Sequence, residues 1–248
     1  MTAVNDLVRP DRYPRSAAYD PAWLLDLDMG PNPLWLLEDL ARDLDPRPGA
    51  RVLDLGSGMG ATSVFLAREY GVRVVAADWW VGAERAAAVF AAAGVGDRVE
   101  AVHAEAHALP FADESFDAIV SIDAFEYFGT ADGYLPYLLR FLRPGGQLAV
   151  ATPAMTREVR EMGAIPPHVK AVVGWEAIAW HTPAWCGSSG RSPNSSRSPP
   201  RGSRRTAGGT GCCGRAPARR RTRRSGRRTS GSSTCSPRTR ARTSASHC

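Results

Sequence analysis

A short apolar run leads directly into a cluster of glycines between residues 51 and 60. Residues 51–55 read as a buried strand, residues 56–60 read Gly-Ser-Gly-Met-Gly, and residues 61–70 read as a helix. Glycines let the backbone turn tightly and approach a ligand, and the start of a helix favours an anionic group. The spacing Gly56-x-Gly58-x-x-Ala61 also fits the dinucleotide-binding fingerprint. The turn therefore predicts a ligand site without choosing its cofactor.

The segments that follow this turn narrow the choice. Asp78 closes a second apolar run, and after it come AEAHALPF at 104–111, ESFDAIVSIDAF at 114–125 and LRFLRPGGQLAV at 139–150. Together with DLGSGMG at 54–60, this order resembles the class I S-adenosylmethionine-dependent methyltransferases. It resembles most closely their ubiquinone/menaquinone-biosynthesis-type small-molecule branch. The resemblance covers roughly residues 33–153 and implies S-adenosyl-L-methionine as the cofactor.

The resemblance also implies which residues hold the cofactor. The turn around its methionine part would be made by Asp54, Gly56, Ser57, Gly58 and Gly60. Asp78 would accept hydrogen bonds from both ribose hydroxyls, as a carboxylate can, with a helix cap at the surface as the alternative role. Trp79 would pack on the adenine, and Glu105, with the backbone of Ala106, would contact its amino group. The family commonly has Asp at this last position, so Glu105 is a departure.

The loop at 121–128, after the fourth predicted strand, should face the transferable methyl group. Ligands of doubly wound sheets bind outside the carboxyl ends of the strands, so Ser121 is counted among the cofactor-binding residues. Glu126 is the candidate general base if the acceptor must lose a proton, and a solvated carboxylate is the alternative. Tyr127 would position the acceptor, and Tyr19 would close over it.

A small organic molecule is the expected acceptor. The loop lacks the Asn/Asp-Pro-Pro-aromatic tetrad of family members that methylate amino groups of nucleic acids. All five cysteines lie at position 186 or beyond, which excludes thiolate catalysis and structural disulfides in the preceding part. No metal site is expected. Two other functions stay open: a NAD-type Rossmann oxidoreductase, and a nonspecific nucleic-acid binder that uses its Arg-rich tail.

Alternating strand and helix patterns supply the framework for these residues. Helices are expected at 32–44, 61–70, 83–93, 133–142, 156–162 and 175–180, and strands at 51–55, 73–77, 99–103, 118–122 and 147–151. Five strands separated by helices predict a doubly wound, Rossmann-like and mostly parallel sheet in three α/β/α layers. The family adds an antiparallel hairpin as strands six and seven, and we expect both to be missing here. The fifth strand would then be an open edge.

Composition changes abruptly after residue 185. Residues 187–248 contain 16 Arg but no acidic and no large apolar residue, which leaves 15 Lys and Arg against 25 Asp and Glu before them. Such a tail cannot offset about 1–2 kcal/mol of backbone entropy per residue and is expected to be disordered. The preceding part is acidic, which argues against nucleic-acid binding by the domain.

We interpret the tail as the product of a frameshift near codon 186. Codons rich in G and C that are read out of frame encode mostly Arg, Gly, Ala, Pro, Ser, Thr and Cys, which are the residue types of this tail. A genuine Arg/Ser-rich RNA-binding tail is the alternative. The expected organisation is an N-terminal segment or lid at 1–31, a methyltransferase domain at 32–185, truncated at its C-terminal end, and the tail at 186–248. Without an apolar leader or a long apolar run, a cytoplasmic location away from membranes is expected. The oligomeric state stays open.

Overall fold

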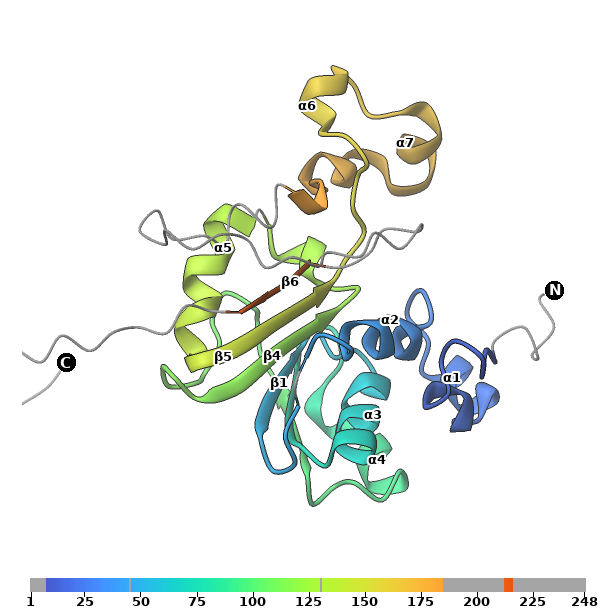
Figure 1. The fold of residues 1–248 in the computed structure, drawn as a ribbon, viewed down its shortest axis with the longest axis vertical. Helices are drawn as coiled ribbons and strands as arrows, with labels where there is room; N and C mark the ends of the chain where they lie inside the picture. Colours follow the sequence, from blue (N-terminus) through green and yellow to red (C-terminus); the bar gives the residue numbers. More distant parts are fainter. Residues whose placement is uncertain (1–7, 45, 130, 185–211, 216–248) are drawn as a thin grey trace, which may run out of the picture. The chain divides into compact units, whose positions relative to one another are not determined.

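A computed structural model describes residues 8–44, 46–129, 131–184 and 212–215 (Figure 1). All of these residues belong to one unit, Met1–Ala218. Within the described ranges, no helix is both long and apolar enough to cross a membrane.

A parallel sheet forms the framework of this unit. Its strands are β1 (Arg51–Leu55), β2 (Arg73–Asp78), β3 (Val99–His103), β4 (Phe116–Ile122), β5 (Leu142–Ala151) and β6 (Cys212–Arg215). Their order is β3-β2-β1-β4-β5-β6, and the first five run parallel. Leu53 of the central β1 pairs with Val75 on one side and Ile119 on the other. This arrangement confirms the predicted Rossmann-like class.

Helices cover both faces of the sheet because successive strand side chains point to opposite sides. Val52 points into a core shared with α2 (Pro33–Leu40), α3 (Ala61–Tyr70) and α4 (Ala83–Ala92). Its neighbour Leu53 points into a second core shared with α5 (Ala131–Leu138). In Figure 1, α3 and α4 accordingly lie on one side of the strands and α5 on the other. The three predicted layers are present.

The fifth strand differs from the prediction at its start. It begins at Leu142 rather than at 147, so the Pro-Gly-Gly sequence at 144–146 lies within the strand. The pairing with β4 shifts register there: Phe116 pairs with Leu142, whereas Ala118 pairs with Gln147. The expected turn is therefore a bulge, which inserts extra residues into one strand without ending the ladder.

The far edge of β5 also differs from the prediction. Cys212–Arg215 pairs antiparallel with Gln147–Val150, so β5 is not the last strand of the sheet. A row of unpaired backbone N–H and C=O groups accepts a neighbouring strand whatever its side chains. A short β6 therefore stands where we expected strand six to be missing. The expectation of a disordered tail at 186–248 otherwise falls outside the described residues.

Several helices outside the central layers are shorter or additional. They are η2 (Ser16–Ala18), α1 (Pro21–Asp26), η3 (Phe125–Phe128), η4 (Leu139–Phe141), α6 (Val159–Met162), α7 (Pro167–Val173) and η5 (Gly174–Ala179). The predicted helix at 156–162 is reduced to α6, and the one at 175–180 is the 3-10 helix η5. Helices α1 and α7 were not predicted. Both begin with a proline, whose fixed φ suits the first helical position.

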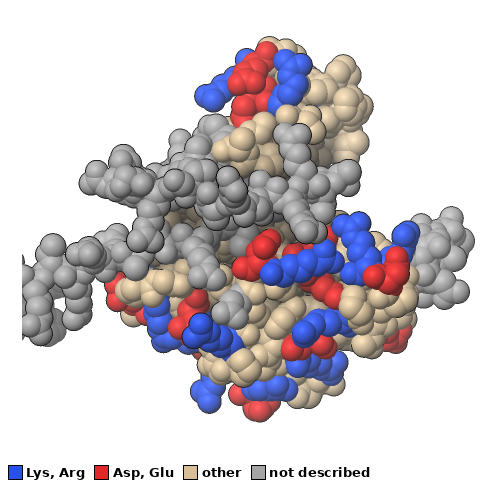
Figure 2. Space-filling model, in the orientation of Figure 1, with Lys and Arg blue, Asp and Glu red and all other residues tan. Residues whose placement is uncertain are grey.

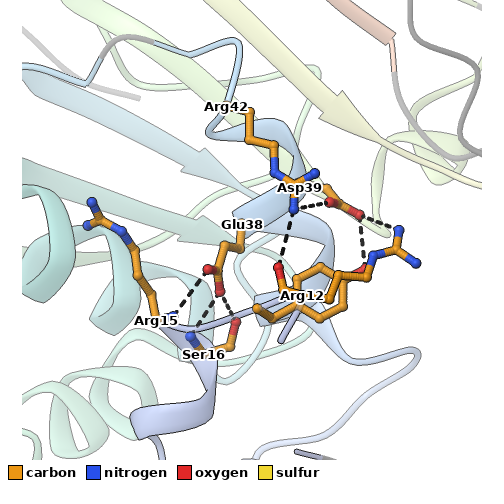
Figure 3. Close-up of polar contacts among 7 residues, drawn as sticks. Arg12, Arg15, Ser16, Glu38, Asp39 and Arg42 are labelled. Carbon is orange, nitrogen blue, oxygen red and sulfur yellow. Dashed lines mark hydrogen bonds and ion pairs between the residues drawn. The ribbon is translucent and has the colours of Figure 1, made fainter. Parts of the chain in front are cut away.

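The N-terminal segment is fastened to α2 through a buried carboxylate, as Figure 3 shows. Glu38 is only 7% exposed. Its two oxygens accept hydrogen bonds from the backbone N–H of Arg15 (3.1 Å), the backbone N–H of Ser16 (2.9 Å) and the Ser16 hydroxyl. Burying a carboxylate is costly unless donors surround it. These three donors therefore hold the segment at one place on the domain.

The neighbouring Asp39 makes more exposed contacts with the same segment. Its carboxylate accepts hydrogen bonds from the Arg12 guanidinium (3.2 Å) and the Tyr13 hydroxyl (3.0 Å) and forms an ion pair with Arg42 (3.2 Å). Exposed ion pairs contribute little because water and salt screen them. Glu38, rather than Asp39, is thus the main polar attachment.

We expect the substitution Glu38→Gln to lower the free energy of unfolding by about 2 kcal/mol, since an amide N–H₂ would face a buried backbone donor. Denaturant unfolding monitored by circular dichroism would measure this. Asp39→Asn is the matched control and should cost less than about 1 kcal/mol. Equal effects of the two substitutions would contradict the assignment.

Candidate functional site

The glycine turn after β1 is joined directly to the end of β2. The backbone N–H of Gly58 donates to Asp78 Oδ2 (2.8 Å), and the N–H of Gly56 donates to the Ala77 carbonyl (2.8 Å). Gly56, Gly58 and Gly60 have φ values of 72°, 53° and 90°. Residues with side chains rarely adopt such values. The local backbone therefore explains the glycines, and the hydrogen bond to Asp78 explains where the turn is held.

Close neighbours add a second requirement for glycine. A Cβ atom at position 56 would collide with the Ala124 side chain, and one at position 60 would collide with the ring of Phe90. At position 58 it would meet Met29 Sδ at 3.0 Å. The turn is thus packed from both sides, and Met29 shows that the N-terminal segment reaches it.

Asp78 makes the cap contacts that were the alternative to a cofactor role, and its binding of ribose hydroxyls stays a prediction. Its Oδ1 accepts hydrogen bonds from the backbone N–H groups of Trp80 (2.7 Å) and Val81 (2.8 Å), as a cap of the following turn would. Its Oδ2 accepts from Gly58 and belongs to the cleft wall. A carboxylate offers about four acceptor positions, so capacity remains for a ligand hydroxyl.

A cleft of about 100 Å³ lies at this end of the sheet. Its wall consists of residues 27–31, 33, 56–62, 78, 80 and 122–124. The ionisable residues among them are Asp28, Asp78 and Asp123, and none of the described lining residues is Lys, Arg or His. Ser57 lies in the wall at 8% exposure, and its hydroxyl has no hydrogen-bond partner among the described residues. The cleft therefore suits a ligand that carries positive charge and donates or accepts hydrogen bonds.

Asp54 lies behind the cleft wall and is fully buried. Its Oδ2 accepts hydrogen bonds from the hydroxyls of Thr62 and Ser63, both at 2.6 Å, whereas Oδ1 has no partner among the described residues. Burial raises the pKa of Asp54 to about 6, against the lowering effect of the two hydrogen bonds, and the charge of Asp78 adds to the rise. Asp54 thus holds the start of α3, where Thr62 faces the cleft.

Other predicted cofactor residues lie near this end of the sheet but outside the cleft wall. Trp79 stacks on His103, with ring centroids 5.0 Å apart and planes at 5°. The Glu105 carboxylate accepts a hydrogen bond from the backbone N–H of His107 (2.8 Å) and makes another with the Nδ1 atom of the His107 ring (2.9 Å). The hydrogen bond to the ring lowers the pKa of Glu105. The carbonyl of Ala106 accepts from the buried Tyr134 hydroxyl (2.8 Å), and Ser121 is buried within β4. Their cofactor roles stay predictions.

The predicted acceptor residues are distributed differently from the expectation. Glu126 accepts a hydrogen bond from the Thr152 hydroxyl (2.8 Å) and is not part of the cleft wall. Tyr127 is 52% exposed and makes an edge contact with Trp80, with centroids 5.0 Å apart. Trp80 lines the cleft, so Tyr127 lies next to a residue of the cleft wall without belonging to it.

Tyr19 lies in the hydrophobic core and not over the cleft. It is 8% exposed, its ring packs on Phe65, and its hydroxyl donates to Glu69 (3.1 Å). Burial, followed by the charge of Glu69 and the hydrogen bond to it, raises the Tyr19 pKa. The expected closure of Tyr19 over an acceptor is therefore wrong: its ring packs between Trp23 and Phe65, and burying an aromatic ring in the core is favourable.

The cleft residues that were missed from the sequence include Asp28, Trp80 and Asp123. Asp123 directly follows β4 and has a left-handed φ of 52°, which Asp tolerates better than most residues. Its position at a strand end was the available signal. Trp80 carried the same signal as Trp79, and nothing local distinguished the two. Asp28 lies in the N-terminal segment, far from the glycine turn in the sequence, so only the folded chain shows that it lines the cleft.

The sheet order and the cleft at the ends of the strands define a Rossmann-like ligand-binding domain, and comparisons with known proteins identify its family. Residues 52–146 match the model of the methyltransferase domain family. Demethylmenaquinone methyltransferase of Clavibacter sepedonicus is 36% identical over 177 residues, which is 66% of this chain and 68% of that protein. The chain belongs to the family of S-adenosylmethionine-dependent methyltransferases.

Further comparisons agree with this assignment. Methyltransferase GfsG of Streptomyces halstedii is 38% identical over 117 residues, covering 47% of this chain and 42% of that protein. A solved S-adenosylmethionine-dependent methyltransferase of Geobacter sulfurreducens, in complex with S-adenosylhomocysteine, has the same fold, with a TM-score of 0.52 at 24% identity over 74% of this chain and 70% of that one. The predicted family and cofactor are confirmed.

We expect Gly56→Ala to destabilise the protein and to abolish S-adenosylhomocysteine binding, because the new methyl group collides with Ala124 and the backbone is left-handed. A loss of about 2 kcal/mol or more is expected in thermal unfolding. Gly82→Ala is the control, since no atom lies within 4 Å of a Cβ there. Normal binding by the Gly56 variant would contradict the packing argument.

Asp54 should make stability depend on pH. Its pKa is higher in the folded protein than its ordinary value of 3.8, so its stabilising contribution is complete below about pH 4 and is lost as pH rises through 6. Asp54→Asn should remove about 3 kcal/mol of this decline, measured as unfolding free energy from pH 4 to 7.

Asp117→Asn is the control for this titration. Although burial raises the pKa of Asp117, hydrogen bonds from the Arg51 backbone and the Arg143 side chain lower it overall. Its contribution is therefore lost as pH falls, in the opposite direction. A pH profile unchanged by Asp54→Asn would show that the carboxyl group does not titrate in this range.

Proposed function

We propose that this chain binds S-adenosylmethionine in the cleft between the glycine turn and residues 122–124 and transfers its methyl group to a small organic acceptor. The observation that carries the proposal is the 2.8 Å hydrogen bond from Gly58 N–H to Asp78 within the wall of one cleft. It brings together the two features on which the assignment of the cofactor site depends.

The chain's own residues fit this cofactor. The Ser57 hydroxyl, which has no partner among the described residues, and the remaining acceptor capacity of Asp78 can bind ligand hydroxyl or amino groups. The start of α3, at Ala61, supplies backbone N–H groups suited to a carboxylate. When bound, S-adenosylmethionine supplies an electrophilic methyl group. The protein's task is then to align the acceptor and exclude water.

The exposed aromatic pair beside the cleft favours an acceptor with apolar surface. Trp80, which lines the cleft, and Tyr127 are both more than half exposed and contact each other. Similar proteins are named for demethylmenaquinone, sterol and glycine-type substrates. All three are small molecules, which supports a small organic acceptor here. Glu126 as general base stays a prediction, and Thr152 is the residue that would orient it.

Neither alternative function gains support. A pyrophosphate of a nicotinamide cofactor would meet carboxylates in the cleft without a basic partner among the described lining residues. Several surface cations are paired with acids, as in Arg140–Asp113 (3.0 Å) and Arg143–Asp117 (2.7 Å). On the described part of the visible face, Figure 2 shows blue and red residues intermixed rather than a basic patch of the domain itself. The alternative that uses the Arg-rich tail depends on residues outside the described ranges, apart from 212–215.

The organisation of the whole chain stays a proposal. The limits of the N-terminal segment at 1–31, the domain at 32–185 and the frameshifted tail at 186–248 are retained from the sequence, as is a cytoplasmic location. The chain spans 68% of the Clavibacter relative but less than half of the Streptomyces one. Sequencing the gene across codon 186 would test the frameshift.

We expect Asp78→Ala to weaken S-adenosylhomocysteine binding at least 100-fold, because a ligand acceptor and the anchor of the glycine turn are both lost. Calorimetry would measure the affinity, with NAD as the competing ligand. Asp97→Ala, at an exposed loop position, is the control. Binding of NAD but not of S-adenosylhomocysteine by the unaltered protein would overturn the proposed function.

A further inference from the structure

Two carboxylates from distant parts of the sequence meet at the cleft. Asp28 comes from the N-terminal segment, and Asp123 follows β4; both lie in the cleft wall. The two approach each other around Gly30. Asp28 Oδ1 accepts a hydrogen bond from the Gly30 N–H (3.1 Å), and a Cβ atom at Gly30 would collide with the Asp123 carboxylate. Their proximity thus rests on packing of the backbone between them.

Asp123 is held in this position by its own backbone. Its N–H donates to the Ala151 carbonyl (2.7 Å), which ties it to the end of β5, and its φ of 52° turns the chain away from the sheet. Burial, followed by the charge of Asp28, raises the pKa of Asp123. No basic residue among the described lining residues offsets the two charges. Asp28 is exposed, whereas Asp123 is partly buried. A partly buried carboxylate beside a second carboxylate, without a basic partner among the described lining residues, favours a cationic ligand.

A second observation independently indicates a ligand here. Ser57 belongs to the same cleft wall, is more than nine-tenths buried and leaves its hydroxyl without a partner among the described residues. A buried polar atom of this kind costs free energy unless a ligand or water satisfies it. The carboxylates and the hydroxyl therefore form part of one binding surface.

The reaction itself removes a positive charge from the cofactor. The acceptor's electron pair forms the new bond to the methyl carbon, and the electrons of the carbon–sulfur bond return to sulfur. A sulfonium cation thereby becomes a neutral thioether. Carboxylates near the cofactor attract the first form and lose that attraction to the second.

We infer that Asp28 and Asp123 form a charge-selective pair that favours the sulfonium cofactor over its thioether product. The inference rests on the proposed function and assigns these two residues a positioning role in it. Because Asp28 belongs to the N-terminal segment, loss of the charge after transfer weakens the contact between this segment and β4. The pair therefore favours exchange of product for fresh cofactor.

Calorimetry without an acceptor tests this inference on the full chain. The ligands are S-adenosylmethionine, sinefungin, which carries a protonated amine in place of the sulfonium, and the neutral S-adenosylhomocysteine. The variants are Asp123→Asn and Asp28→Asn. Asn adopts the left-handed backbone at least as readily as Asp, so position 123 should fold. Asp26→Asn is the control, since it removes an equal charge from an exposed residue outside the cleft wall.

Each cleft variant should lower the preference for the two cationic ligands over S-adenosylhomocysteine by about five- to tenfold relative to the unaltered protein. The Asp26 variant should leave the preference within about twofold. Equal weakening of all three ligands, or an unchanged preference in both cleft variants, would overturn the inference. Failure of the unaltered protein to bind any of them would instead contradict the proposed function, and this inference with it.

Discussion

The hydrogen bond from the Gly58 N–H to the Asp78 carboxylate is the contact on which the site depends. It joins the turn after β1 to the end of β2. The same carboxylate accepts from Trp80 and Val81, so the loop into α4 is attached to it as well. Because one side chain satisfies three backbone donors, two loops are fixed relative to each other before any ligand binds. Such preorganisation lowers the ordering cost of binding.

The sheet order determines where this contact can serve a ligand. The chain runs from β1 outward to β2 and β3, then returns to place β4 on the other side of β1. The loops after β1 and β4 therefore diverge, which leaves space at the carboxyl ends of the strands. Gly56 packs on Ala124 across this divide. The position of the cleft thus follows from the order of the strands. The glycines of the turn, which have no side chains, leave the cleft unfilled.

The sequence was sufficient to predict the glycine turn and the carboxylate beside it. It was not sufficient to predict which way the side chains of the loops point. The glycines reveal their left-handed backbone directly, and a parallel sheet requires Asp78 to lie beside them. Trp79 and Trp80 are chemically equivalent, however, and only the turn around Asp78 directs Trp80 to the cleft. Glu126 likewise has Thr152 as its partner because β4 and β5 pair. Five strands were predictable because each repeats an apolar pattern; the short β6 has no such pattern.

The N-terminal segment shows why the remaining part of the site required the structure. Glu38 holds residues 15 and 16 on α2, and the chain then passes through α1 to bring Asp28 and Met29 against the glycine turn. Buried carboxylate bonds fix the upstream end, whereas the downstream end is exposed and rests on the cleft. Opening of the downstream end alone breaks fewer buried contacts, so its free energy should be lower than that of global unfolding. A ligand that contacts this end stabilises the closed form, which couples cofactor affinity to a segment outside the strand-turn-helix motif.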